Sequence, residues 1–135
     1  MNKEQLIDYL NGLFQMASSL SDYIGPSYIK VDCYLKEEFK EEFCNNYNIK
    51  GLDIKKSNKT IETALLDWFG TDEKIIESIL YWLNINNIKI KTIYYFSEDL
   101  LNNLNNQHQD FYFLEDIIIA ESSEYIIILL LGNNE

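Results

Sequence analysis

Residues 125–131 are apolar at every position, and this run constrains the fold more than any other part of the sequence. Successive side chains of a β-strand point to opposite faces of the sheet, so a strand without polar positions needs cover on both faces. The run follows a largely apolar segment, residues 111–120, across a short polar turn at 121–124. The pattern predicts a β-hairpin whose second strand is central in its sheet.

The N-terminal region has the period of a helix. Its apolar residues between Leu6 and Ile24 step by three or four positions, which places them on one helical face. Asn2 and Gln5 are spaced to cap this helix, Gly25 is placed to end it, and Gly12 is a candidate kink. We expect further helices at residues 36–44, 61–69 after a Ser57 or Asn58 cap, 72–83 after a Thr71 cap, and 98–104 after a Ser97 cap.

Two other segments are expected to be strands. Residues 29–35 alternate between apolar and polar side chains, and residues 88–96 follow an Asn-Asn turn. Residues 45–58 contain lysines but have no clear period, which predicts a solvated loop. The element order is then α-β-α-α-α-β-α-β-β, a single α+β domain over residues 1–135 with a mainly antiparallel sheet of about four strands. Strand order and oligomeric state stay open.

The charge balance excludes several classes of ligand. The chain has 22 acidic residues against 11 basic ones, for a formal net charge of −11, and every basic residue is a lysine. Without arginine the chain lacks the planar fork suited to gripping phosphate. The negative charge also repels the phosphate backbone of nucleic acids. We therefore expect no nucleic-acid partner and no membrane partner.

The sequence has few groups suited to catalysis or metal binding. The only histidine, His108, lies in a polar stretch near Asp110 and is expected to be a solvated structural residue. Cys33 and Cys44 have no metal-ligand spacing and are expected to be small buried apolar residues. No phosphate-binding glycine loop or nucleophile motif is present. We expect no cofactor, no metal and no enzymatic activity.

Two features favour a cytoplasmic location. The two cysteines do not form the dense framework of a disulfide-stabilised secreted protein. The N-terminal residues mix charges and lack the uninterrupted apolar segment of a signal peptide.

The acidic residues concentrate in the last third of the chain. Residues 92–135 contain eight acids and no lysine, interleaved with seven aromatic residues. An acidic field accelerates the encounter with a basic partner, and aromatic residues are favoured as interface anchors. If Phe111 and Phe113 face inward, Tyr112 faces the opposite side. The candidate partner-binding residues are Glu98, Asp99, Asp110, Tyr112, Glu115, Asp116, Glu121 and Glu124. A second candidate patch on a short acidic helix comprises Glu37, Glu38, Glu41 and Glu42.

In size, acidity and lack of catalytic motifs, the chain resembles the one-domain immunity proteins that protect bacteria from their own toxins. The resemblance implies a small inhibitor that occludes a basic protein partner such as a nuclease toxin, with carboxylates standing in for substrate phosphates. One alternative is a small-ligand-binding protein or carboxylate-dependent enzyme with a pocket between sheet and helices. Another is a regulatory or scaffold subunit of a larger assembly.

Overall fold

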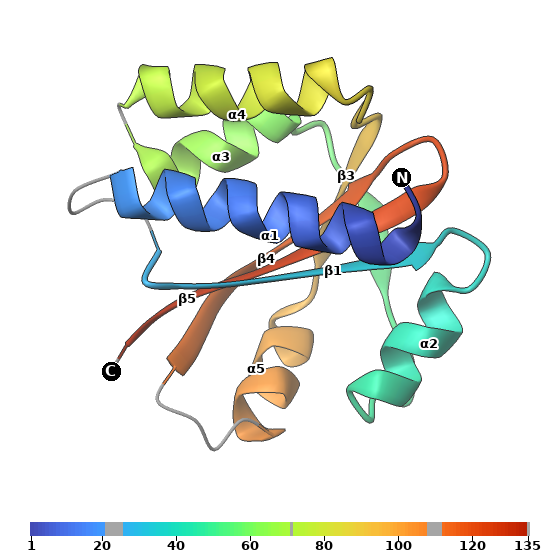
Figure 1. Ribbon diagram of the computed structural model, residues 1–135. Helices are drawn as coiled ribbons and strands as arrows, with labels where there is room; N and C mark the ends of the chain where they lie inside the picture. The colour runs from blue at the N-terminus through green and yellow to red at the C-terminus, as the bar shows by residue number, and fades with distance from the viewer. Residues whose placement is uncertain (21–25, 71, 108–111, 135) are drawn as a thin grey trace.

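A five-stranded antiparallel sheet organises the molecule (Figure 1). The computed structural model describes residues 1–20, 26–70, 72–107 and 112–134. The spatial order of the strands is β1-β5-β4-β3-β2. Their bounds are β1 Tyr28–Leu35, β2 Ile54–Lys56, β3 Thr92–Phe96, β4 Tyr112–Glu121 and β5 Tyr125–Asn134.

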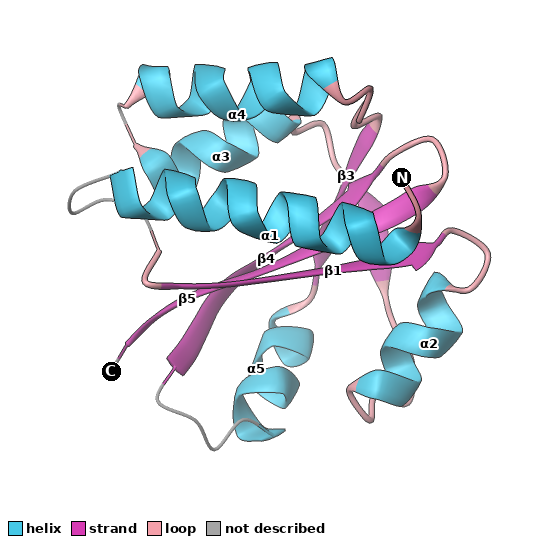
Figure 2. Cartoon of the chain, in the orientation of Figure 1, coloured by secondary structure: helices cyan, strands magenta, loops and turns pink. Residues whose placement is uncertain are grey.

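Helices cover both faces of this sheet, in the arrangement that Figure 2 shows. On one face lie α1 Lys3–Leu20, α3 Ile61–Phe69 and α4 Glu73–Ile85; on the other lie α2 Phe39–Asn46 and α5 Glu98–Gln107. The α+β class, the antiparallel pairing and the expected order of helices are confirmed.

The apolar C-terminal strand behaves as predicted. β5 lies between β1 and β4, so both of its edges are paired. Ile127, Leu129 and Leu131 pack into the core beneath α1, α3 and α4. The alternate residues Ile126, Ile128 and Leu130 pack into the second core, with α2 and α5. Residues 126–131 of β5 are therefore all apolar because each of them faces one of the two cores.

The expectation of about four strands was wrong by one. The additional strand is β2, which lies inside the segment expected to be a loop. It pairs three residues with β3, from Ile54 against Phe96 to Lys56 against Tyr94. A strand of this length is too short to show a period in the sequence. Because it is an edge strand, only one side of it needs to be paired.

Both sheet edges are protected against pairing with another chain. β2 is short and presents the exposed lysines Lys55 and Lys56, two features that discourage edge-to-edge association. At the β1 edge, the Gln15 side chain of α1 donates to the Ile29 carbonyl at 2.9 Å, and the Asp32 carboxylate accepts from the Cys33 N–H at 2.9 Å.

Several predicted helix boundaries are confirmed. The Gln5 N–H donates to the Asn2 side chain, and the Gln5 side chain accepts from the Asn2 N–H, which makes the expected capping pair of α1. Ser97 caps α5 as expected, because its hydroxyl accepts from Leu100 N–H at 3.3 Å. α1 continues through Gly12 and ends at Leu20, whereas the expected end at Ile24–Gly25 lies outside the described residues.

Other boundaries differ from expectation, and α2 begins at Phe39 rather than at residue 36. α3 is capped by Thr60 and not by Ser57 or Asn58, because Thr60 and Thr63 exchange the two hydrogen bonds of a capping box. α4 is capped by Asp72, whose carboxylate accepts from Ile75 N–H; the expected cap, Thr71, lies outside the described residues. The strand expected at 88–96 begins at Thr92, where pairing with β4 starts.

Candidate functional site

A hollow with charged, polar and aromatic lining residues lies between α3 and the end of β3 beside β4. This cleft has a volume of about 260 Å³. Four charged side chains line it, together with Tyr95 of β3. We name it the α3–β3–β4 cleft; its polar and aromatic lining includes Ser57, Lys59, Asp67, Tyr94, Tyr95, Phe96, Glu98 and Asp116.

A β-bulge aims Asp116 into this cleft. The register between β4 and β5 shifts between Leu114 and Asp116, which leaves Glu115 as the extra residue. Leu114 faces the core of α2 and α5, and in a regular strand Asp116 would face the same side. The extra residue turns Asp116 to the α3 side instead. There its carboxylate accepts 2.8 Å hydrogen bonds from the Trp68 indole N–H and from its neighbour's backbone, Ile117 N–H.

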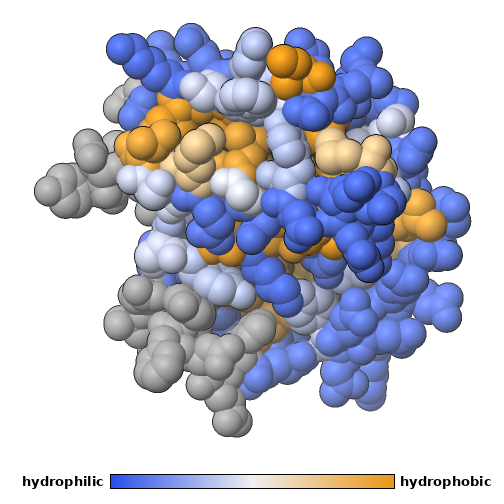
Figure 3. Space-filling model, in the orientation of Figure 1, coloured by the Kyte–Doolittle hydropathy of each residue, from blue (hydrophilic) through white to orange (hydrophobic). Residues whose placement is uncertain are grey.

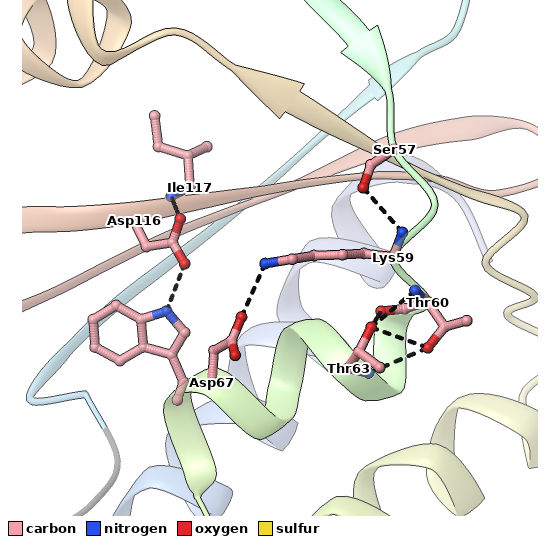
Figure 4. Close-up of polar contacts among 8 residues, drawn as sticks. Ser57, Lys59, Thr60, Thr63, Asp67, Asp116 and Ile117 are labelled. Carbon is pink, nitrogen blue, oxygen red and sulfur yellow. Dashed lines mark hydrogen bonds and ion pairs between the residues drawn. The ribbon is translucent and has the colours of Figure 1, made fainter.

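Lys59 extends across the same cleft from the segment that joins β2 to α3 (Figure 4). Its ammonium lies 3.0 Å from the Asp67 carboxylate on α3. The pKa of Lys59 is raised from its ordinary value, chiefly by this hydrogen bond; burial opposes the rise, and the charges of Asp67 and Asp116 add to it. The cleft thus holds one cation among more than one carboxylate.

Two exposed aromatic side chains lie on the α3 side of the sheet. Tyr95 is 54% exposed at the end of β3, where it lines the cleft. Phe113 is 45% exposed at the beginning of β4. Phe113 pairs with Asn133 on β5. Asn133 lies two residues from Leu131, which packs into the core on the α3 side, so Phe113 also faces the α3 side. The helical layer covers Phe113 only in part at this end of the strand.

The structure divides the first candidate patch between two ends of β4. Glu98 and Asp99 are exposed in the first turn of α5, and Glu115 is exposed at the bulge. Glu121 lies at the other end of β4, about 20 Å from Glu115 at roughly 3.3 Å per residue. Glu124 lies with it, exposed in the hairpin turn.

The remaining residues of that patch lie partly outside what the structure describes. Tyr112 begins β4, but its side chain is outside the described part. Asp110, His108 and Phe111 all lie in the segment 108–111, outside the described residues.

Glu121 belongs instead to a second hollow, of about 290 Å³, between α2 and β3. Its carboxylate accepts from the Tyr94 hydroxyl at 2.9 Å and lies 3.9 Å from the Lys36 ammonium. Burial, followed by the hydrogen bond to Glu121, raises the pKa of Tyr94. Glu37 lines the same hollow, so one residue of each candidate patch meets here.

The other acids of the second patch face solvent. Glu38 and Glu41 are exposed, and Glu42 is half-buried beside Lys3 at 3.7 Å. The pKa of the Glu38 carboxyl is raised, chiefly by its hydrogen bond with Glu42 and then by the charge of Glu42. Because Glu38 lies on an open surface, this pair lacks the enclosure of an acid–base dyad.

The cysteines differ in their surroundings. Cys33 is fully buried as expected, and burial raises the pKa of its thiol to about 12. Cys44 is half-buried, contrary to the expectation that it is a core residue. It follows Phe43, which occupies the inward position of α2. Among the described side chains, no three His, Cys, Asp or Glu residues converge in a way that would hold a metal ion.

An apolar groove separates α1 from α4, where Figure 3 shows orange side chains gathered. It has a volume of about 190 Å³ and is lined by Leu13, Met16, Ala17, Leu20, Lys74, Ile75, Ser78 and Ile79. Its mainly apolar lining offers a contact surface. Within the described ranges, no helix combines the length and apolar character needed to cross a membrane.

Asp116 and Glu98 of the cleft were predicted from the sequence, whereas Lys59, Asp67 and the Trp68 side chain that bonds Asp116 were not. Lys59 directly follows residues 45–58, which were expected to form a solvated loop. The contact between Trp68 and Asp116 joins residues 48 positions apart. No local sequence pattern can therefore indicate it.

Comparisons with known proteins identify no relative. No family model, no curated protein and no solved structure matches this chain.

Proposed function

We propose that this chain is a protein-binding module that occludes a basic protein partner, such as a nuclease toxin, in the manner of an immunity-type inhibitor. The observation that carries the proposal is the exposed ring of Tyr95 beside the carboxylates of the α3–β3–β4 cleft, with the exposed Phe113 on the same side of the sheet. We name this region the acidic–aromatic surface; it comprises Asp67, Tyr95, Glu98, Phe113, Glu115 and Asp116.

Charge and contact area contribute to binding in different ways. Carboxylates on the acidic–aromatic surface attract a basic partner and occupy positions where that partner would bind phosphate. Tyrosine and phenylalanine provide large contact areas at low conformational cost, as is typical of interface hot spots. The charge supports this role at long range, because the protein carries a formal −11.

Affinity capture tests this proposal. The tagged protein is incubated with lysate of its native host, and the captured proteins are identified by mass spectrometry. A variant with Tyr95→Ala, Glu98→Gln and Glu115→Gln removes one exposed ring and two exposed charges from the acidic–aromatic surface. The matched control, Tyr81→Ala with Glu73→Gln and Glu77→Gln, makes the same changes on the exposed side of α4.

We expect one basic protein to be captured by the wild type and the α4 control, and its recovery to fall about tenfold or more with the first variant. Equal recovery with both variants would contradict the proposed surface. Loss of the partner with Glu37, Glu38, Glu41 and Glu42 all replaced by Gln, but not with the first variant, would instead place the interface on the second patch.

A second candidate function is a small-ligand-binding protein or carboxylate-dependent enzyme. The hollow between α2 and β3 favours it, because the Glu121 carboxylate, the Tyr94 hydroxyl and the Lys36 ammonium meet there. Its volume of about 290 Å³ lies near the lower end of the range of ligand pockets. A compound that raises the melting temperature of the wild type but not of Glu121→Gln would support this candidate.

A further inference from the structure

The only cation lining the α3–β3–β4 cleft, among the described residues, is the protein's own Lys59. Its ammonium is 3.0 Å from Asp67, and the carboxylates of Asp116 and Glu98 line the same hollow. Figure 4 shows the Lys59 side chain pointing toward the space between Asp67 and Asp116. The cleft is therefore shaped and charged to hold a cationic side chain, and it holds one in the free protein.

The carboxylate of Asp116 is positioned without help from Lys59. One oxygen accepts from the Trp68 indole and the other accepts from the Ile117 backbone, each at 2.8 Å. A carboxylate has about four acceptor positions, so these two bonds leave room for an additional donor. An acceptor held in place beforehand loses little freedom when a ligand binds.

Lys59, by contrast, is easily displaced. Its side chain is 48% exposed and that of its partner Asp67 is 56% exposed. An ion pair at this level of exposure contributes little to stability, because water and salt screen it and two flexible side chains must be ordered. A competing cation can take the place of Lys59 while the freed ammonium returns to solvent.

We propose that the α3–β3–β4 cleft is the receptor for an arginine side chain of the protein partner, and that Lys59 occupies it as a displaceable internal cation. The inference rests on the proposed function and adds the chemistry of recognition. A guanidinium group fits this cleft better than an ammonium, because its planar fork can bond two carboxylates, here Asp67 and Asp116. The exposed ring of Tyr95 provides a face on which it can stack.

An NMR titration with a single arginine side chain tests this inference without the partner. The ¹⁵N-labelled protein is titrated with N-acetyl-arginine methylamide, and the indole N–H signals of its two tryptophans are followed. Trp68 bonds Asp116 in the cleft and reports binding there. Trp82 is exposed on α4 and serves as the internal control. The uncharged analogue N-acetyl-citrulline methylamide controls for shape without charge.

Lys59→Gln empties the cleft of its own cation and is the decisive variant. We expect the arginine compound to shift the Trp68 signal and not the Trp82 signal, and the apparent Kd to fall about two- to fivefold in Lys59→Gln. Lys89→Gln removes the same charge from an exposed site before β3 and should leave the Kd nearly unchanged. The comparison of Lys59→Gln with Lys89→Gln therefore distinguishes displacement of Lys59 from a general effect of losing one positive charge.

Three results would overturn the inference. The first is a Kd for the arginine compound in Lys59→Gln that is equal to or higher than the Kd in Lys89→Gln. The second is a Trp68 shift of equal size with the citrulline compound. The third is the absence of a Trp68 shift in Lys59→Gln. The titration can fail independently of the affinity capture. Suppose that capture depends on the acidic–aromatic surface but Lys59→Gln does not bind arginine more tightly. This result would support the proposed function and contradict only the arginine receptor.

Discussion

The Trp68 indole N–H donates to the Asp116 carboxylate at 2.8 Å and so joins α3 to β4 across the edge of the candidate cleft. This contact depends on two structural features. The helix must end close to Trp68, and the bulge at Glu115 must turn Asp116 to the α3 side. A polar side chain on a central strand is thereby both paired and accessible, which is an arrangement suited to recognition.

Removing this hydrogen bond should destabilise the protein. Trp68→Phe keeps an aromatic ring but deletes the donor, and a hydrogen bond to a charged group contributes about 1.5–3 kcal/mol. Since Asp116 is only half-buried, we expect a loss of about 1–2 kcal/mol in the free energy of unfolding, measured by urea denaturation. The matched change Trp82→Phe, on the exposed side of α4, should cost under about 0.5 kcal/mol. Equal losses would show that the Asp116 contact contributes nothing.

Gly132 should be intolerant of any side chain. A Cβ there would overlap the Phe113 carbonyl oxygen and approach the Phe113 carbonyl carbon to 2.9 Å, and backbone in a central sheet cannot easily move away. We expect Gly132→Ala to lower the free energy of unfolding by about 3 kcal/mol or to prevent folding. Gly12→Ala is the control, because a Cβ there meets nothing within 4 Å on α1. It should stabilise the protein by about 0.5–1 kcal/mol.

The two cysteines should differ in reactivity. The thiolate is the nucleophile, and burial holds the pKa of Cys33 near 12, so this thiol is protonated and inaccessible at pH 8. Cys44 is half-buried. In the folded protein, iodoacetamide should label Cys44 well before Cys33, and both should react in urea, as read by peptide mass spectrometry. Equal labelling rates without denaturant would contradict the buried position of Cys33.

The same thiol should make stability fall in alkali. The pKa of Cys33 is raised from an ordinary value of 9.0 to about 12 in the folded protein. Between these values the unfolded chain releases a proton that the folded chain keeps, so stabilisation present below pH 9 is lost as pH rises toward 12. One such proton contributes at most about 1.4 kcal/mol per pH unit. Urea midpoints above pH 9 should decline less steeply for Cys33→Ala than for the wild type or for Cys44→Ala.

The sequence was informative wherever the structure depends on local pattern. The apolar run of β5 predicted a strand covered on both faces, and Asn2 with Gln5 predicted the start of α1. Both follow from side-chain period and capping geometry, which operate over a few residues.

Features that depend on distant contacts were not predictable from the sequence. β2 exists because three residues pair with β3, and the direction of Asp116 depends on one unpaired residue in β4. A strictly alternating strand would place Asp116 with Leu114, away from α3. The cleft brings Lys59, Asp67 and Asp116 together from three separate segments, so no spacing in the sequence indicates it.

Attraction of a basic protein to the acidic–aromatic surface can be measured through the rate of association. The captured partner is purified and mixed with this protein in a stopped-flow instrument at low and high salt. Screening of charge attraction should reduce the association rate constant by about tenfold or more between about 50 mM and about 500 mM salt. The Tyr95→Ala, Glu98→Gln, Glu115→Gln variant should show a smaller salt dependence than its α4 control. An association rate constant that is the same at both salt concentrations would contradict the account.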